Sequence, residues 1–140
     1  MAPFPKPPQK SIVYEDANIG ICLATFPFAP GHTIVFWKKP VKDIHLLSCQ
    51  EYENLMHTID IARDALLKTY KTKKVYLLYM DELQQVHWHL VPRIGTETGF
   101  ALFKKELPRV RDFSIVEKIR ENFLKIRKQH PETIFHAPHR

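Results

Sequence analysis

Two histidines, His87 and His89, stand one residue apart in a segment that alternates polar and apolar side chains. Because successive side chains of a strand point to opposite faces, Gln85, His87 and His89 are predicted to share one face of a strand. Imidazole is both a nucleophile and a common ligand of transition metals, so this face could carry either chemistry. The spacing alone is equally compatible with an ordinary half-exposed strand. The surrounding elements and the rest of the sequence are needed to choose.

Runs of strand-forming residues occur along the chain and predict a sheet. They cover residues 12–14, 20–24, 33–37, 75–80 and 86–91. The first two runs are separated by a turn-forming segment, which predicts a hairpin. The last two are predicted to pair antiparallel across a short polar loop. The histidines lie in the last run, so the sheet is expected to position them.

Two helices are predicted from capping boxes that are followed by apolar positions at helical spacing. The box at residues 48–51 opens the first helix, which is expected to extend to about Tyr70. The box at residues 114–117 opens the second, which is expected to end before Pro131. The sequence therefore predicts an α+β fold: an antiparallel sheet of about five strands, one long central helix and one C-terminal helix.

The chain of 140 residues has the usual length of one domain. We expect a flexible, proline-rich arm at residues 1–10, the domain at residues 11–130 and a C-terminal tail at residues 131–140. The longest uncharged apolar stretch, residues 19–36, contains prolines, so no membrane span is expected. The chain begins without an apolar run typical of a secretory signal, which favours a cytoplasmic location.

The formal net charge is +6, which favours the approach of an anionic ligand. The basic residues are spread over the termini, the long helix and residues 104–111 rather than gathered in one stripe. A nucleic-acid partner is therefore not expected. The two cysteines, Cys22 and Cys49, form no zinc or redox motif and are expected to be reduced and buried.

The segment Gln85-Val86-His87-Trp88-His89-Leu90-Val91-Pro92-Arg93 resembles the His-φ-His-φ-His-φ-φ motif of histidine-triad proteins, in which φ is an apolar residue. The likeness continues at residues 12–16, 29–35 and 38–41, which occur in the order seen in that family. It covers roughly residues 11–93. The resemblance implies a histidine-triad fold.

The resemblance also implies a nucleotide hydrolase or transferase. Such an enzyme acts on the α-phosphate of a dinucleoside polyphosphate, for example a diadenosine polyphosphate, or of a nucleoside phosphoramidate. His87 falls on the family's nucleophile, which would form a nucleotidyl-histidine that water then hydrolyses. His89 falls on the third histidine, expected to hydrogen-bond the phosphate or the leaving group, and His32 falls on a fourth that supports it. One nitrogen of a nucleophilic imidazole must be unprotonated, so the other is expected to donate to a backbone carbonyl.

The same resemblance suggests the remaining features of the site. A nucleotide or dinucleotide is the expected partner, and the base would lie among apolar residues such as Ile12, Cys22 and Leu23. Arg93 is left outside the catalytic set. We expect a homodimer, no cofactor required by the protein and no metal held by its side chains. Any divalent metal would enter with the substrate phosphates.

The chain departs from the family pattern in three places. Gln85 stands where the first histidine is expected, and its amide can form hydrogen bonds but cannot transfer a proton. Ala24 stands where relatives usually carry an aspartate or asparagine that holds the ribose hydroxyls. The loop at residues 81–84 is short and lacks the glycine-rich segment that binds phosphates in much of the family.

These departures leave two alternatives to the hydrolase open. The first is a catalytically weakened module that binds nucleotides or regulates another protein. The second is a metal-dependent hydrolase that uses His87, His89 and His32, with Asp81 as the nearest candidate for a further ligand.

Overall fold

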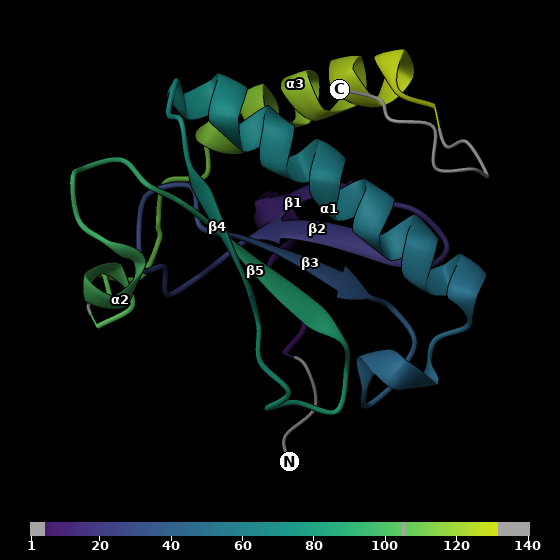
Figure 1. The fold of residues 1–140 in the computed structure, drawn as a ribbon. Helices are drawn as coiled ribbons and strands as arrows, with labels where there is room; N and C mark the ends of the chain where they lie inside the picture. The colour runs from purple at the N-terminus through teal and green to yellow at the C-terminus, as the bar shows by residue number, and fades with distance from the viewer. Residues whose placement is uncertain (1–4, 105, 132–140) are drawn as a thin grey trace.

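The computed structural model describes residues 5–104 and 106–131 (Figure 1). These residues form ten elements in chain order: η1 (Gln9–Ser11), β1 (Ile12–Glu15), β2 (Ile19–Leu23), β3 (Thr33–Trp37), η2 (Ile44–Leu46), α1 (Cys49–Tyr70), β4 (Val75–Tyr79), β5 (His87–Pro92), α2 (Gly99–Leu102) and α3 (Ile115–Gln129). The predicted α+β class is confirmed. Of the predicted arm, residues 1–4 lie outside the described residues, as do residues 132–140 of the predicted tail.

The five strands form one sheet in the order β1-β2-β3-β5-β4, and every neighbouring pair is antiparallel. The predicted hairpin and the pairing of β4 with β5 are confirmed. The long helices α1 and α3 lie together on one side of the sheet (Figure 1). Side chains from the strands that pack into the core on that side are Val13, Ile19, Ile21, Leu23, Val35, Trp37, Val75 and Leu90.

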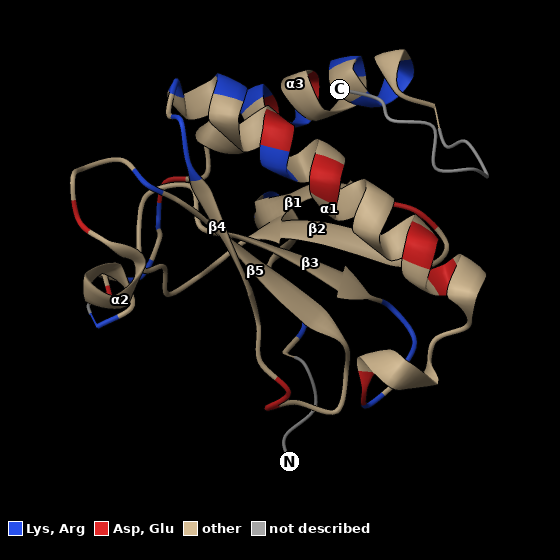
Figure 2. Ribbon diagram, in the orientation of Figure 1, with Lys and Arg blue, Asp and Glu red and all other residues tan. Residues whose placement is uncertain are grey.

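Strand alternation assigns the intervening side chains to the opposite face, which we call the site face. It carries Cys22, Ile34, His87 and His89. The strands β2 to β5 contain no aspartate, glutamate, lysine or arginine, and the charged residues lie on the helices, the loops and the end of β1 (Figure 2). The site face is therefore built from neutral side chains.

Helix α1 begins at the predicted capping box. The Ser48 hydroxyl oxygen accepts from the Glu51 amide at 3.1 Å, and the Glu51 carboxylate accepts from the Ser48 amide at 2.9 Å. The helix ends at Tyr70, and Lys71 follows it in the left-handed conformation with φ 51°. Most of its predicted apolar stripe lies in the core, namely Leu55, Ile59, Ala62 and Leu66. Tyr52 and Cys49 were also predicted to be buried, and both predictions are wrong, because these residues lie in the exposed first turn of the helix.

The predicted capping box at residues 114–117 is wrong. Ser114 has helical backbone angles and its side chain makes no capping hydrogen bond. Instead, the Asp112 carboxylate accepts from the Ser114 amide at 2.9 Å, so an acceptor two residues earlier satisfies this amide. Helix α3 still ends before Pro131 as predicted and buries Ile119 and Phe123. Within the described residues, no helix is long and apolar enough to cross a membrane.

Candidate active site

A row of apolar side chains crosses the site face and leads to the histidines. Direct cross-strand partners align Ile12 with Cys22, Cys22 with Ile34, Ile34 with His89, and His89 with Leu78. Partners that are directly opposite in a sheet share a face, so these side chains form one row across all the strands. Burial raises the pKa of the Cys22 thiol to about 12, which keeps it protonated and neutral. The row provides an apolar floor beside His89.

His87 is the first residue of β5 and is 5% exposed. Its Nδ1 atom lies 2.9 Å from the backbone carbonyl oxygen of Gln85. A carbonyl only accepts hydrogen bonds, so Nδ1 must carry the proton. In the neutral ring, the lone pair is then on Nε2. The hydrogen bond expected of a nucleophilic imidazole is present at His87.

His89 is joined to a second histidine from the loop before β3. The His32 Nε2 and His89 Nδ1 atoms are 2.9 Å apart, and the Phe28 amide donates to His32 Nδ1 at 3.1 Å. Because His32 Nδ1 accepts, the proton of the neutral His32 ring must be on Nε2, from which it is donated to His89. The neutral His89 ring therefore carries its own proton on Nε2. We call these two residues the His32–His89 pair.

The environment keeps the His32–His89 pair neutral. Burial, followed by the neighbouring His89, lowers the pKa of His32 to about 3. Burial, followed by the neighbouring His87, lowers the pKa of His89 to about 4. Both imidazoles are thus uncharged near neutral pH, which the chain of hydrogen bonds from the Phe28 amide requires.

The two strand histidines therefore hold opposite tautomers side by side. Their ring centroids are 5.2 Å apart. His87 has a lone pair on Nε2, whereas His89 has an N–H group at the same ring position. A lone pair can attack an electrophile, and the adjacent donor can bind an oxygen of the same group. This arrangement suits transfer of a phosphoryl or acyl group.

Comparison with known proteins identifies the fold that builds this site. Residues 7–96 match the family model described as the HIT domain. The chain belongs to the histidine-triad family. A sequence comparison with curated proteins gives no match.

Solved histidine-triad structures share the fold at low sequence identity. A hypothetical histidine triad nucleotide-binding protein from Sulfolobus tokodaii has a TM-score of 0.69 and 20% identity, over 86% of this chain and 87% of that chain. A Zn-bound histidine triad family protein from Mycobacterium smegmatis has a TM-score of 0.67 and 20% identity, over 84% and 86%. Diadenosine triphosphate hydrolase from Plasmodium falciparum, in complex with cyclomarin A, has a TM-score of 0.57 and 15% identity, over 92% and 82%. These identities establish the shared fold alone.

Gln85, at the place of the first histidine of the triad, does not turn its side chain to the imidazoles. Its amide nitrogen donates to the carbonyl oxygens of Trp37 at 2.7 Å and Lys38 at 3.1 Å. Strand β5 begins only at His87, so Gln85 precedes the regular alternation on which its placement was based. Its side chain ties the start of β5 to the end of β3, while its backbone carbonyl holds His87.

The three residues expected at the base pocket separate onto two faces. Ile12 and Cys22 are cross-strand partners in the row on the site face. Leu23 is 4% exposed and belongs to the core cluster on the opposite side. Ala24 is also buried, and its amide donates to the His32 carbonyl oxygen at 2.8 Å, so its position contributes backbone to the site but no polar side chain.

Sequence reasoning did not identify Phe28, which touches His32 in two ways. Besides the hydrogen bond from its amide, its ring stacks on the His32 ring at a centroid distance of 5.5 Å and an interplanar angle of 17°. Phe28 lies in an irregular loop, where no periodic pattern assigns a side chain to a face. The only sequence signal is an aromatic residue close before a histidine, which by itself indicates little.

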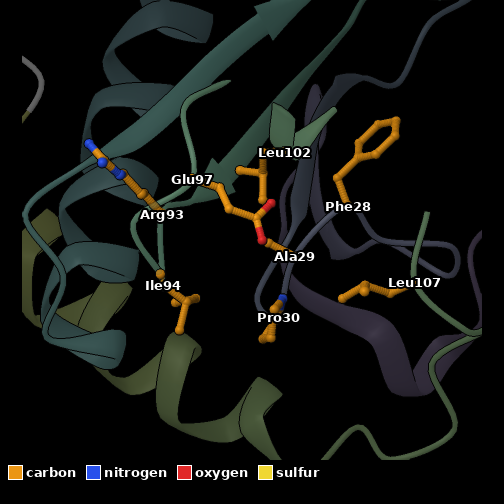
Figure 3. A pocket seen from close by; sticks show the side chains of 9 residues that line it. Phe28, Ala29, Pro30, Arg93, Ile94, Glu97, Leu102 and Leu107 are labelled. Carbon is orange, nitrogen blue, oxygen red and sulfur yellow. The ribbon is translucent and has the colours of Figure 1, made fainter. Parts of the chain in front are cut away.

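A pocket of about 200 Å³ lies beside Phe28 (Figure 3). Figure 3 shows that the Arg93 side chain points away from the other lining residues, whereas the Glu97 carboxylate points toward Ala29. The Arg93 guanidinium donates to the Thr96 carbonyl oxygen at 2.8 Å. The Arg93 guanidinium is therefore tied to the loop that follows β5.

The metal-dependent alternative lacks a ligand set in the part of the chain that the structure describes. Among residues 5–104 and 106–131, no group of three or more histidine, cysteine, aspartate or glutamate side chains is arranged to hold a metal ion. Both ring nitrogens of His32 already have hydrogen-bond partners. Asp81 is exposed in the loop between β4 and β5.

Proposed function

We propose that this histidine-triad protein is a nucleotidyl hydrolase or transferase with His87 as the nucleophile. Its substrate would be a dinucleoside polyphosphate or a nucleoside phosphoramidate, cleaved at the α-phosphate. The observation that carries the proposal is the pair of opposite tautomers, which sets the His87 Nε2 lone pair beside the His89 Nε2–H donor. A nucleophile and a donor for a non-bridging oxygen are the groups that an in-line displacement at phosphorus requires.

In the first proposed step, His87 Nε2 attacks the α-phosphorus. A nitrogen–phosphorus bond forms as the bond between phosphorus and the leaving group breaks. The leaving group takes the electron pair of that bond and gains a proton from water. The His87 ring becomes positively charged, and its Nδ1–H bond to the Gln85 carbonyl strengthens accordingly. In the second step water attacks phosphorus and loses a proton to solvent. The nitrogen–phosphorus bond breaks, and its electron pair returns to Nε2. The products are the nucleoside monophosphate and the leaving group.

Strands β2 to β5 contain no lysine or arginine, so no cationic side chain on these strands neutralises the negative charge of the phosphates. The neutral His89 donor can bind one oxygen, and the net charge of +6 provides a general attraction for anions. We expect a divalent cation, where one is needed, to arrive with the substrate phosphates rather than to be held by the protein.

The test is release of nucleoside monophosphate from diadenosine polyphosphates and adenosine phosphoramidate, followed by chromatography. We expect the wild type to give a nucleotidyl-protein adduct that mass spectrometry detects after alkaline denaturation, because a phosphorus–nitrogen bond is labile in acid. His87→Ala is expected to abolish both the release of monophosphate and this adduct. His45→Ala is the matched control, because the His45 side chain is 73% exposed. Release by folded His87→Ala at the wild-type rate would contradict the assignment of the nucleophile.

A binding or regulatory module is the second candidate. Two observations favour it. The Gln85 side chain donates to the backbone carbonyls of Trp37 and Lys38, and Ala24 offers no polar side chain. A folded wild-type protein that binds these nucleotides in calorimetry but releases no monophosphate would favour the module.

We also propose a cytoplasmic homodimer, by analogy with the family. Strand β4 is an edge of the sheet and exposes Leu77 at 41% and, just beyond it, Met80 at 38%. Edge strands with exposed apolar side chains are suited to pairing with a second chain. Light scattering after gel filtration should give twice the chain mass, and Leu77→Lys should reduce it to one chain.

A further inference from the structure

The segment that follows the matched HIT domain runs along the loop that carries Phe28. The Leu107 amide donates to the Pro27 carbonyl oxygen at 2.7 Å, and the Val110 amide donates to the Thr25 carbonyl oxygen at 2.8 Å. These bonds connect residues 107–110 to the loop between β2 and β3. The match to the family ends at residue 96, so this contact comes from chain outside the matched domain.

An aromatic contact extends from that segment to the histidines. Phe103, directly after α2, meets the Phe28 ring edge-on at a centroid distance of 5.5 Å and an angle of 76°. Its ring also meets Tyr76 of β4 at 6.1 Å and 69°. Phe28 in turn stacks on His32, which is hydrogen-bonded to His89. Phe103 is thus wedged between the sheet and the ring that covers His32.

We propose that Phe28 and Phe103 are positioning residues that hold the His32–His89 pair in the tautomers needed for the reaction. Phe103 is then part of the working site although it follows the matched domain. This inference rests on the proposed function for its catalytic meaning, but the tautomers themselves can be measured without any substrate.

The Phe28 ring is fixed by its aromatic neighbours rather than by the cavity. Phe28 lines a cavity of about 200 Å³, but its ring points away from the other lining side chains (Figure 3). The edge-to-face contact with Phe103 gives the ring a directional contact. Without Phe103, we expect the Phe28 ring to shift on His32 and to move its backbone amide away from His32 Nδ1.

Loss of the hydrogen bond from the Phe28 amide to His32 would change the tautomer of His89. His32 Nδ1 would no longer be held as an acceptor, so His32 could carry its proton there and present a lone pair to His89. His89 would then be protonated on Nδ1 and would present a lone pair, not a donor, from Nε2. A lone pair facing a phosphate oxygen repels it, so turnover should fall.

The experiment compares Phe103→Ala with Phe100→Ala. Phe100 lies on α2, three residues before Phe103, but is 87% exposed, which makes it a matched control. Long-range proton–nitrogen NMR of the histidine rings at neutral pH reports the tautomers of His32 and His89 in the substrate-free protein. Phe103→Ala should change the ring-nitrogen shifts of both histidines and lower kcat about tenfold or more, whereas Phe100→Ala should change neither.

Unchanged tautomers in folded Phe103→Ala would overturn the inference, whatever the activity. Phe103→Tyr, which keeps the aromatic edge, should restore the wild-type tautomers. If Phe103→Ala does not fold, Phe103→Leu replaces it, because leucine keeps much of the volume but not the edge-to-face contact. A wild type that releases no monophosphate would remove the proposed function, while the NMR comparison would still decide the role of Phe103.

Discussion

His87 and His89 lie on the same face of the same strand, yet different kinds of contact fix their protons. The His87 ring bonds to the carbonyl of Gln85, two residues earlier in the chain. The His89 ring bonds to His32, which is 57 positions away, and the tautomer of His32 depends in turn on Phe28. The tautomer of the nucleophile His87 is therefore fixed by local backbone geometry, whereas the tautomer of the donor His89 is fixed by contacts of the tertiary fold. A change in the fold can impair the second without touching the first.

Among the changes that leave the nucleophile in place, removal of the donor is expected to have the largest effect. His89→Ala should lower kcat about 100-fold to 1000-fold, the usual loss when one donor to a developing charge is removed. His87 should keep its proton on Nδ1, because its carbonyl partner is unchanged. Steady-state kinetics and histidine NMR measure the two results.

His45→Ala serves again as the exposed control for His89→Ala. A decrease in kcat of less than about threefold in His89→Ala, less than about 0.7 kcal/mol in the barrier, would show that His89 is not a donor in the reaction. If the His87 proton is no longer on Nδ1 in the same variant, the tautomers of the two rings are not fixed independently.

The next effect in size is the pH dependence of folding. Burial lowers the pKa of His32 to about 3 and that of His89 to about 4, from 6.5. Below pH 6.5 the unfolded chain takes up protons that the folded chain does not, so stability is complete above this pH and falls as the pH drops toward the folded-state values. Each histidine should contribute up to about 1.4 kcal/mol per pH unit. Urea unfolding near pH 7 and near pH 5 measures the loss.

Removing one member of the pair tests where this dependence originates. His32→Gln keeps polar groups in the loop but does not titrate, so the loss of stability between the two pH values should become smaller than in the wild type. An equal loss in His32→Gln and the wild type would contradict a buried, neutral His32.

Elements whose pattern is local could be predicted from the sequence. The capping box at Ser48 and the apolar stripe of α1 follow from neighbouring residues, and the strands follow from short runs of strand formers. The second box failed although its residues match the pattern, because Asp112, two residues earlier, offers a carboxylate to the Ser114 amide. Two candidate caps compete there, and the sequence pattern alone does not rank them.

The site divides in the same way. The carbonyl that bonds to His87 lies two residues earlier in the chain, so this partner could be expected from the sequence. The stacking of the Phe28 ring on His32 could not, because Phe28 lies in an irregular loop with no periodic pattern. Leu23 could have been excluded from the sequence, since it is adjacent to Cys22 and neighbouring residues of a strand point to opposite faces. Gln85 could not, because its side-chain direction depends on where β5 begins.

The smallest expected effect on turnover, at Gln85, tests the local half of the comparison. Gln85→Ala removes two hydrogen bonds to the carbonyls of Trp37 and Lys38, and should lower the free energy of unfolding by about 1 to 2 kcal/mol. It keeps the backbone carbonyl that holds His87, so kcat should change less than about threefold. Gln85→His, which restores the side chain of the family motif, should likewise leave kcat nearly unchanged, because this side chain is directed to the end of β3. A large loss of kcat in Gln85→Ala with unchanged stability would instead place the Gln85 side chain in the reaction.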